Sequence, residues 1–163
     1  MRADFTSFYE TEASRLVRSL ALAIDDPVLA EDAAAEAFAR AWARWPEVST
    51  RDSPSAWVMR VALNQARDRF RRRRVERRKA SAIARADVVH DPQPHLDLRL
   101  WHAVRDLPEQ ERTLVALRYV ADLPQTEIAR LLGLPPGTVA SALSRARHKL
   151  GVALGTTYQE ELT

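Results

Sequence analysis

The spacing of apolar residues predicts helices along most of the chain, and no stretch alternates between apolar and polar residues over a useful length as a strand would. Phe5, Phe8, Leu16 and Leu20 fall on one helical face and predict a first amphipathic helix. Residues 25–27 (Asp-Asp-Pro) interrupt that helix and offer a cap and a first-turn proline to the next one.

A second helix is predicted over residues 28–45, and three large apolar side chains anchor it: Phe38, Trp42 and Trp45. Pro46 is expected to end this helix, and residues 46–54 have the composition of a polar loop. A third helix is predicted to begin near Ser55 and to continue into a run of arginines.

Residues 80–95 lack apolar periodicity and contain prolines that disfavour helix, so we predict a flexible linker there. Stretched, about 16 residues reach roughly 55 Å. Helices are predicted to resume over residues 96–105, 109–121, 125–132 and 137–151. The fold class is therefore all-α, with two small helical domains at residues 1–79 and 96–155, the flexible linker between them and an unassigned tail at 156–163.

Residues 124–150 have the layout of a helix-turn-helix. Gly133 suits the left-handed backbone of the turn, and the prolines at 135–136 suit the first turn of the second helix. The first helix has an apolar face made by Ile128, Leu131 and Leu132, and the second is expected to bury Val139, Leu143, Ala146 and Leu150. An ordinary helical hairpin is the alternative, but the turn residues and the cations late in the second helix favour DNA reading.

The other face of this second helix is polar and basic, with Ser141, Ser144, Arg145, Arg147, His148 and Lys149. The cations late in the helix are predicted to contact phosphates, because they lie beyond the first turns that approach base edges. Base contacts are expected from residues 136–144, where the small side chains offer few hydrogen bonds.

The positive charge of the chain is concentrated in one short stretch. Residues 67–79 carry nine basic and two acidic side chains, a net charge of +7 in a chain whose total is +3. Such a run favours a polyanion through counterion release, although a solvated basic helix end is the alternative. Trp57, Asn64 and Phe70 lie on or near the same helix, and rings and amides beside cations suit unpaired bases.

The helix at 28–45 carries Glu31, Asp32 and Glu36 on its polar side. They form either a solvated face over the core or a docking surface for a basic partner. The spacing of these residues favours neither interpretation over the other.

Composition narrows the function classes. The absence of cysteine excludes disulfides and thiolate chemistry, and no window approaches 18 consecutive apolar residues. With no apolar secretion core at the N-terminus, a cytoplasmic protein is expected. No phosphate-binding loop or Ser-His-Asp pattern is present, so neither an enzyme nor a cofactor is predicted. No metal site is predicted either, because its best candidates flank prolines in the linker: His90, Asp91 and His95.

Taken in order, these stretches resemble the extracytoplasmic-function group of sigma factors in the sigma-70 family, over about residues 4–152. AEDAAAEAFARAW, from Ala30, resembles the segment that docks on the clamp-helix coiled coil of RNA polymerase's largest subunit. SAWVMRVALNQARDRFRRRR, from Ser55, resembles the segment that melts and reads the −10 element. The stretch from Leu107 to Leu150 resembles the domain that binds the −35 element and the polymerase flap.

The resemblance carries over residue by residue to three sets of positions. The polymerase-binding set is Asp32, Glu36, Phe38, Arg40 and Trp42. The set at the −10 element is Trp57, Arg60, Asn64, Asp68, Arg71, Arg72, Arg73 and Arg74. The set at the −35 element is Gln125, Thr126, Pro136, Gly137, Thr138, Ser141, Ser144, Arg145, Arg147 and Lys149. The loop at residues 46–54 would lie where the family captures a flipped-out base.

The resemblance implies a sigma factor that acts by binding, with core RNA polymerase and promoter DNA as partners and commonly an anti-sigma factor that holds it inactive. No membrane or small-molecule substrate is implied. Two rival readings are a stand-alone helix-turn-helix regulator and a sigma-like adaptor that binds polymerase without initiating. The chain departs from the family at residues 33–35, where it has alanines in place of bulkier residues. It also has alanine at Ala140 and Ala142, where the family commonly places basic residues, and this is expected to remove two DNA contacts.

Overall fold

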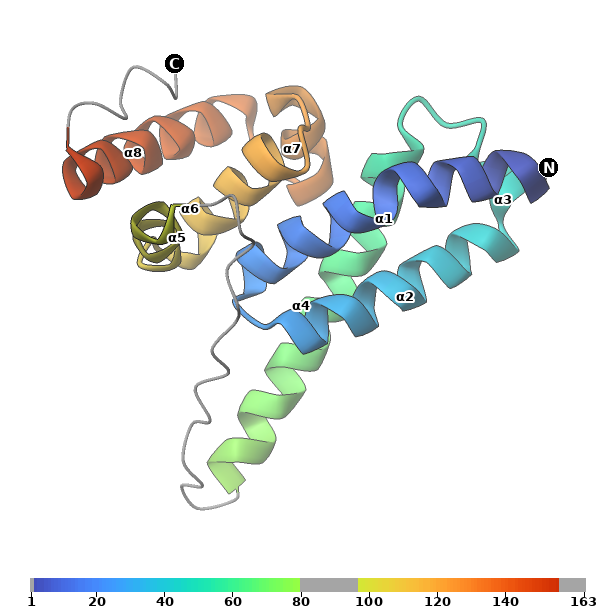
Figure 1. Cartoon of the computed structure of the whole chain (residues 1–163), viewed down its shortest axis with the longest axis horizontal. Helices are drawn as coiled ribbons and strands as arrows, with labels where there is room; N and C mark the ends of the chain where they lie inside the picture. Colours follow the sequence, from blue (N-terminus) through green and yellow to red (C-terminus); the bar gives the residue numbers. More distant parts are fainter. Residues whose placement is uncertain (1, 80–96, 156–163) are drawn as a thin grey trace.

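A computed structural model describes residues 2–79 and 97–155, and within these ranges the chain is helical (Figure 1). The elements are α1 (Arg2–Ile24), α2 (Pro27–Ala43), α3 (Trp45–Val48), α4 (Pro54–Lys79), α5 (Leu98–Arg105), α6 (Glu109–Val115), the π-helical turn η1 (Ala116–Val120), α7 (Gln125–Leu132) and α8 (Pro136–Leu154). The predicted linker at 80–95, including His90, Asp91 and His95, and the tail at 156–163 lie outside the described residues.

The break between α1 and α2 forms where it was predicted. Asp25 adopts a left-handed backbone with φ of 54° and ends α1. Asp26 is the N-cap of α2, and its carboxylate accepts a hydrogen bond from the backbone N–H of Leu29 at 3.0 Å. Pro27 follows in the first turn, where its missing N–H costs nothing.

The prediction that one helix runs over 28–45 and that Pro46 ends it is wrong at its end. Helix α2 stops at Ala43, and Trp45 begins the short helix α3, which carries Pro46 in its first turn. Proline is compatible with a helix start because the first N–H groups have no partner within the helix. The expected polar loop is therefore helical in its first part.

The first domain packs α1, α2 and α4 around a small apolar core, and α1 and α2 run side by side (Figure 1). Buried alanines such as Ala33 and Ala37 allow α2 to approach its neighbours closely, while Leu20 and Leu63 fill the space between the helices. Aromatic rings close the end near the N-terminus, where Phe5 lies 5.0 Å from Trp42.

The second domain contains the predicted helix-turn-helix. Gly133 ends α7 with φ of 64°, and Pro135 and Pro136 lead into α8. The residues expected on the inner face of α8 are all buried: Val139, Leu143, Ala146 and Leu150. The predicted helix at 109–121 is not α-helical throughout, because at η1 the N–H of Ala121 bonds to the carbonyl of Ala116 in the wider π pattern.

The two domains pack against each other. Helix α1 contacts α6 and η1, and α4 contacts α7. Buried apolar residues of both domains belong to one continuous cluster, which includes Leu20 of α1 and Leu114 of α6. Figure 1 shows the second domain against the C-terminal part of α1, while the arginine-rich end of α4 projects away from the body. Within residues 2–79 and 97–155, none of the helices combines the length and the apolar composition that a membrane span requires.

Candidate nucleic-acid interface

Helix α4 places a row of polar side chains on one face. Trp57, Arg60, Asn64, Asp68 and Arg71 are three or four residues apart, so they follow one side of the helix. The opposite side is anchored in the core by a set of buried residues: Val58, Met59, Ala62, Leu63 and Ala66. The helix thus presents a continuous strip on which an aromatic ring, an amide and cations succeed one another.

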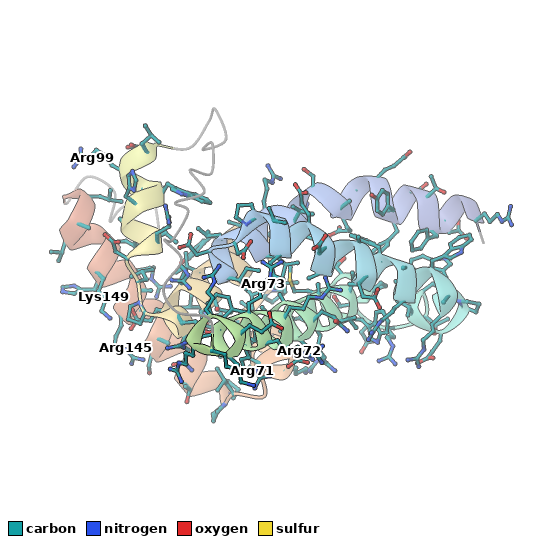
Figure 2. The ribbon with its side chains drawn as sticks, turned by 90° about the horizontal axis from the view of Figure 1, so that it is seen from below. Arg71, Arg72, Arg73, Arg99, Arg145 and Lys149 are labelled. Carbon is teal, nitrogen blue, oxygen red and sulfur yellow. The ribbon has the colours of Figure 1, made fainter. Side chains whose placement is uncertain are left out.

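The four consecutive arginines of α4 have different surroundings. Arg72 and Arg74 are exposed, whereas Arg71 bonds to Asp68 within its own helix at 2.5 Å. Arg73 turns back to α2, where its Nη1 donates to Asp26 Oδ2 at 3.2 Å. Figure 2 shows Arg71, Arg72 and Arg73 along α4, together with Arg145 and Lys149 of α8. Arg73 therefore ties α4 to the α2 cap instead of standing free for an external phosphate.

A charged cluster that was not predicted from the sequence lies over the ring of Trp57. The guanidinium carbons of Arg44 and Arg51 lie 5.9 and 6.0 Å from the centroid of the Trp57 ring, within cation–π range. Glu47 joins the two, accepting from Arg44 Nη2 at 2.6 Å and from Arg51 Nη2 at 2.7 Å. Hydrogen bonds from Arg51, which has the larger effect, and from Arg44 lower the pKa of the Glu47 carboxyl. Arg44 lies three residues before Glu47 and Arg51 lies four residues after it. This spacing is the feature of the sequence from which the cluster could have been predicted.

The residues expected to bind polymerase divide into surface and core. The side chains of Asp32, Glu36 and Arg40 are exposed, and Glu36 pairs with Arg40 at 2.9 Å. Asp32 also lies 3.8 Å from Arg69 of α4. Phe38 is only 5% exposed, whereas Trp42 is 44% exposed.

The prediction that Phe38 is part of the docking surface therefore needs correction, because its ring is buried in the core. The centroid of this ring lies 4.9 Å from that of Tyr9. Two of the three alanines at 33–35 are also core positions, since Ala33 and Ala34 are buried and Ala35 alone is exposed. A bulkier residue at either buried position would change helix packing before it changed a docking surface.

The N-terminal part of the helix-turn-helix reading helix is open. Five residues of the predicted −35 set in α8 are exposed there, namely Pro136, Gly137, Thr138, Ser141 and Ser144, as are Gln125 and Thr126 at the start of α7. A Cβ at Gly137 would meet nothing within 4 Å, so packing does not require glycine at this position. Ala140 is exposed, but Ala142 is 0% exposed, so the expectation that Ala142 marks a lost DNA contact is wrong.

The cations late in α8 have partners inside the second domain. Lys149 and Arg145 both approach Glu111 of α6, whose side chain is 7% exposed, with N···O distances of 2.8 Å and 3.5 Å. Arg147 Nη1 donates to the Tyr119 hydroxyl at 3.2 Å. Glu111 lies 38 residues from Lys149 along the chain, so no spacing within one helix indicates that the two residues meet.

A cleft of about 760 Å³ separates the exposed strip of α4 from α6. Asn64, Asp68 and Arg71 line it on the α4 side, and Glu109 and Arg112 line it on the other. The strip predicted to meet DNA thus faces the second domain. In the described ranges, no group of three or more His, Cys, Asp or Glu side chains is arranged to hold a metal ion.

Comparison with known families and proteins matches both halves of the chain. The family model described as Sigma-70 region 2 matches residues 9–76, and the one described as Sigma-70, region 4 matches residues 97–150. The chain is 30% identical to the RNA polymerase sigma-E factor of Streptomyces antibioticus over 94% of its own length and 86% of that protein. It is 30% identical to the RNA polymerase sigma factor CarQ of Myxococcus xanthus over 93% and 89%.

Further similarity comes from another relative and from a solved structure. The ECF RNA polymerase sigma factor SigW of Bacillus subtilis is 29% identical over 74% of this chain and 73% of its own. The sigma factor RpoE of Bartonella quintana, solved in complex with the anti-sigma factor NepR, has the same fold, with a TM-score of 0.79 at 23% identity over 93% of this chain and 96% of that one. Two family models in order along the sequence, and relatives matched almost from end to end, show that this chain belongs to the RNA polymerase sigma factors of the sigma-70 family, in their extracytoplasmic-function group.

Proposed function

We propose that this chain binds core RNA polymerase and directs it to promoters, using α4 to stabilise the opened −10 strand and the α7–α8 pair to read the −35 element. Residues 1–79 form the domain for polymerase and the −10 element, and residues 96–155 form the −35 domain. The observation that carries the proposal is the polar strip of α4, where the half-buried Trp57 is followed by the exposed Asn64 and Arg71 beside the rest of the basic run.

Single-stranded DNA suits this strip on physical grounds. Each base that stacks on an aromatic side chain gains about 1–3 kcal/mol, which is comparable to the cost of unstacking it from the duplex. Arg72 and Arg74 supply charge for the phosphates on either side. Arg44, Glu47 and Arg51 extend the strip around Trp57, and this cluster is the natural place for an extruded base.

Polymerase docking is assigned to the outer face of α2. The pair between Glu36 and Arg40 and the approach of Asp32 to Arg69 are solvent-exposed ion pairs, which contribute little to stability. A basic partner surface therefore competes for these carboxylates at low cost. Trp42, near the C-terminal end of α2, adds an exposed ring that makes a T-shaped contact with Phe5.

The −35 contacts are assigned chiefly to the first turns of α8. Pro136 and Gly137 stand at an exposed helix N-terminus, which carries partial positive charge and suits a phosphate. The pairing of Lys149 and Arg145 with Glu111 reduces the charge that α8 offers to DNA. We assign to these two cations a smaller share of the affinity than their number suggests.

The chain acts by binding alone, and phosphodiester synthesis belongs to the polymerase. It works in the cytoplasm, where polymerase and promoter DNA are found, and an anti-sigma factor is a further proposed partner, as in the solved complex of RpoE with NepR.

The test is transcription by purified core polymerase, with and without the chain, on a library of promoter fragments from its source genome. Initiation from a defined set of fragments supports the proposal. Polymerase binding without initiation favours the adaptor reading, and DNA binding without polymerase binding favours the stand-alone regulator. A variant with Trp57→Ala and Asn64→Ala is expected to keep polymerase affinity and lose initiation, which separates the α4 strip from the docking face.

A further inference from the structure

We propose that the cleft between α4 and α6, together with a smaller pocket that adjoins it, is a binding site for a nucleoside polyphosphate. The phosphates would lie among the arginines of the cleft and the base in the pocket, and Arg67 of α4 lines both parts. Binding of a nucleotide does not depend on the proposed function, whereas its effect on DNA binding rests on it.

Arg67 is a half-buried cation at the junction of the two parts. The cleft has a volume of about 760 Å³ and the pocket one of about 390 Å³, and ligand sites in proteins commonly have roughly 300–1,000 Å³. No group among residues 2–79 and 97–155 pairs with the Arg67 guanidinium, although Glu109 lines the same two spaces. A half-buried guanidinium has lost part of its hydration, and an anion that replaces the lost water is favoured beside it.

The lining of the cleft is positive. Four arginines and two carboxylates line it, which leaves a net charge of +2. Besides Arg67, the arginines are Arg71 and Arg74 of α4 and Arg112 of α6, so they reach the cleft from both sides. Each guanidinium offers paired N–H donors that match phosphate oxygens, and several of them around one space suit a chain of phosphates.

The pocket has a different lining, which a bare phosphate chain would not use. Leu132 and Leu134, at the end of α7 and just after it, form an apolar wall. Gln110 and Thr113 of α6 add an amide and a hydroxyl. An apolar wall with a few hydrogen-bonding groups suits a flat ring that has polar edges, as a nucleic-acid base has. A nucleotide uses both parts of the site.

A nucleotide in this site competes with single-stranded DNA. Asn64, Arg71 and Arg74 line the cleft and also belong to the set assigned to the −10 element. One guanidinium cannot hold a nucleotide phosphate and a DNA phosphate in the same place. By mass action, nucleotide at ten times its dissociation constant lowers the apparent affinity of α4 for the strand about elevenfold.

The test is calorimetric titration of the full chain at low salt with ATP and with inorganic tripolyphosphate, which has the phosphates without the base. ATP is expected to bind with a dissociation constant below about 1 mM, and about threefold or more tighter than tripolyphosphate. Arg67→Ala is expected to weaken ATP binding about tenfold, and Arg67→Lys, which keeps the charge, is expected to recover part of the loss.

Arg74→Ala and Arg77→Ala form a matched pair. Both arginines are exposed on α4, but Arg74 lines the cleft and Arg77 lines neither space. Neither substitution alters the packed interior, so folding is expected to be retained, and thermal unfolding checks this for every variant. Arg74→Ala is expected to weaken ATP binding severalfold, whereas Arg77→Ala is expected to leave it nearly unchanged.

Gln110→Ala separates the base from the phosphates. Gln110 is exposed, and loss of its hydrogen bond to the base is expected to weaken ATP binding about two- to tenfold and to leave tripolyphosphate binding unchanged. Tripolyphosphate that binds as tightly as ATP would overturn the assignment of the pocket to a base, and so would equal losses for the two ligands in Gln110→Ala.

Absence of ATP binding at millimolar concentration would overturn the nucleotide site. Equal weakening by Arg74→Ala and Arg77→Ala would also overturn it, because that result indicates diffuse attraction to the basic helix. Competition is measured with a fluorescent single-stranded oligonucleotide of mixed sequence. If ATP binds but does not displace the oligonucleotide, the nucleotide site stands and the assignment of α4 to DNA fails. If the chain directs initiation but binds no ATP, the proposed function stands and the nucleotide site fails.

Discussion

Glu111 of α6 lies beneath α8, and both of its carboxylate oxygens accept hydrogen bonds from the Lys149 ammonium, at 2.9 and 2.8 Å. Arg145 approaches the same carboxylate at 3.5 Å. A nearly buried carboxylate thus holds two cations of the reading helix against its own domain. The arrangement ties α8 to α6 and neutralises part of the positive charge on this half of α8.

Replacement of Glu111 by Gln is expected to have opposite effects on stability and on DNA binding. It should lower the free energy of unfolding by about 1–3 kcal/mol, because the Lys149 and Arg145 charges lose their partner. The freed cations should steepen the salt dependence of −35 binding by about one to two units. Urea unfolding and binding across a salt series measure the two effects. A shallower or unchanged salt dependence would show that these cations do not reach phosphate.

Glu47 links Arg44 and Arg51 beside Trp57, and the hydrogen bonds from Arg51 and Arg44 lower the pKa of its carboxyl from the ordinary value of 4.5. A lowered folded-state pKa means that the cluster's contribution is fully present above 4.5 and is lost as the pH falls through the folded value. Carboxyl NMR titration of the folded protein should therefore give a midpoint below 4.5 for Glu47. Arg51→Ala should raise that midpoint more than Arg44→Ala, and equal midpoints in all three proteins would contradict the cluster.

Arg72 and Arg73 are adjacent in sequence but are expected to differ in function. Arg72 is exposed, whereas Arg73 bonds to Asp26 at the α2 cap. Arg72→Ala should reduce the salt dependence of single-strand binding by about 0.7 units and leave unfolding unchanged. Arg73→Ala should leave that dependence nearly unchanged and lower stability by a few tenths of a kcal/mol, since the pair is partly exposed. Equal loss of DNA binding in the two variants would reject the distinction.

The docking face of α2 is tested by reversing charge at Asp32 and Glu36. Because both side chains are exposed, Asp32→Lys with Glu36→Lys should leave folding intact and weaken binding to core polymerase by at least tenfold. Glu10→Lys serves as the control, because it reverses the charge of one exposed carboxylate on α1, outside the docking face. Affinity is measured with core polymerase in solution at two salt concentrations. Wild-type affinity in the α2 variant would remove the docking assignment.

Substitution of the two aromatic residues of α2 separates a core role from a surface role. Phe38→Ala should lower the free energy of unfolding by about 3–5 kcal/mol, because a buried ring is removed from the core. Trp42 is already 44% exposed, so Trp42→Ala should lower the free energy of unfolding less than Phe38→Ala does. Its main effect should be a lower affinity for polymerase. Thermal unfolding and polymerase binding of both variants decide the point, and a mild effect of Phe38→Ala on stability would contradict its core position.

Most of the local structure could be predicted from sequence. The Asp-Asp-Pro break, the left-handed Gly133 and the proline start of α8 each depend on the conformational preferences of one or two residues. The error at Pro46 has the same local origin, because a proline can end one helix or begin the next. The sites were harder to predict, since polar residues on a helix look alike in sequence whether solvent or a partner faces them.

The helices, the turn of the helix-turn-helix, the position of the basic run and the family could all be predicted from the sequence, because each depends on neighbouring residues or on motifs in order. Which charges have partners depends on how the helices pack. The pairs Lys149–Glu111, Arg73–Asp26 and Arg105–Asp25 join residues 38, 47 and 80 positions apart. Such contacts form when helices pack, and no periodicity along a single helix reports what another helix will place opposite it.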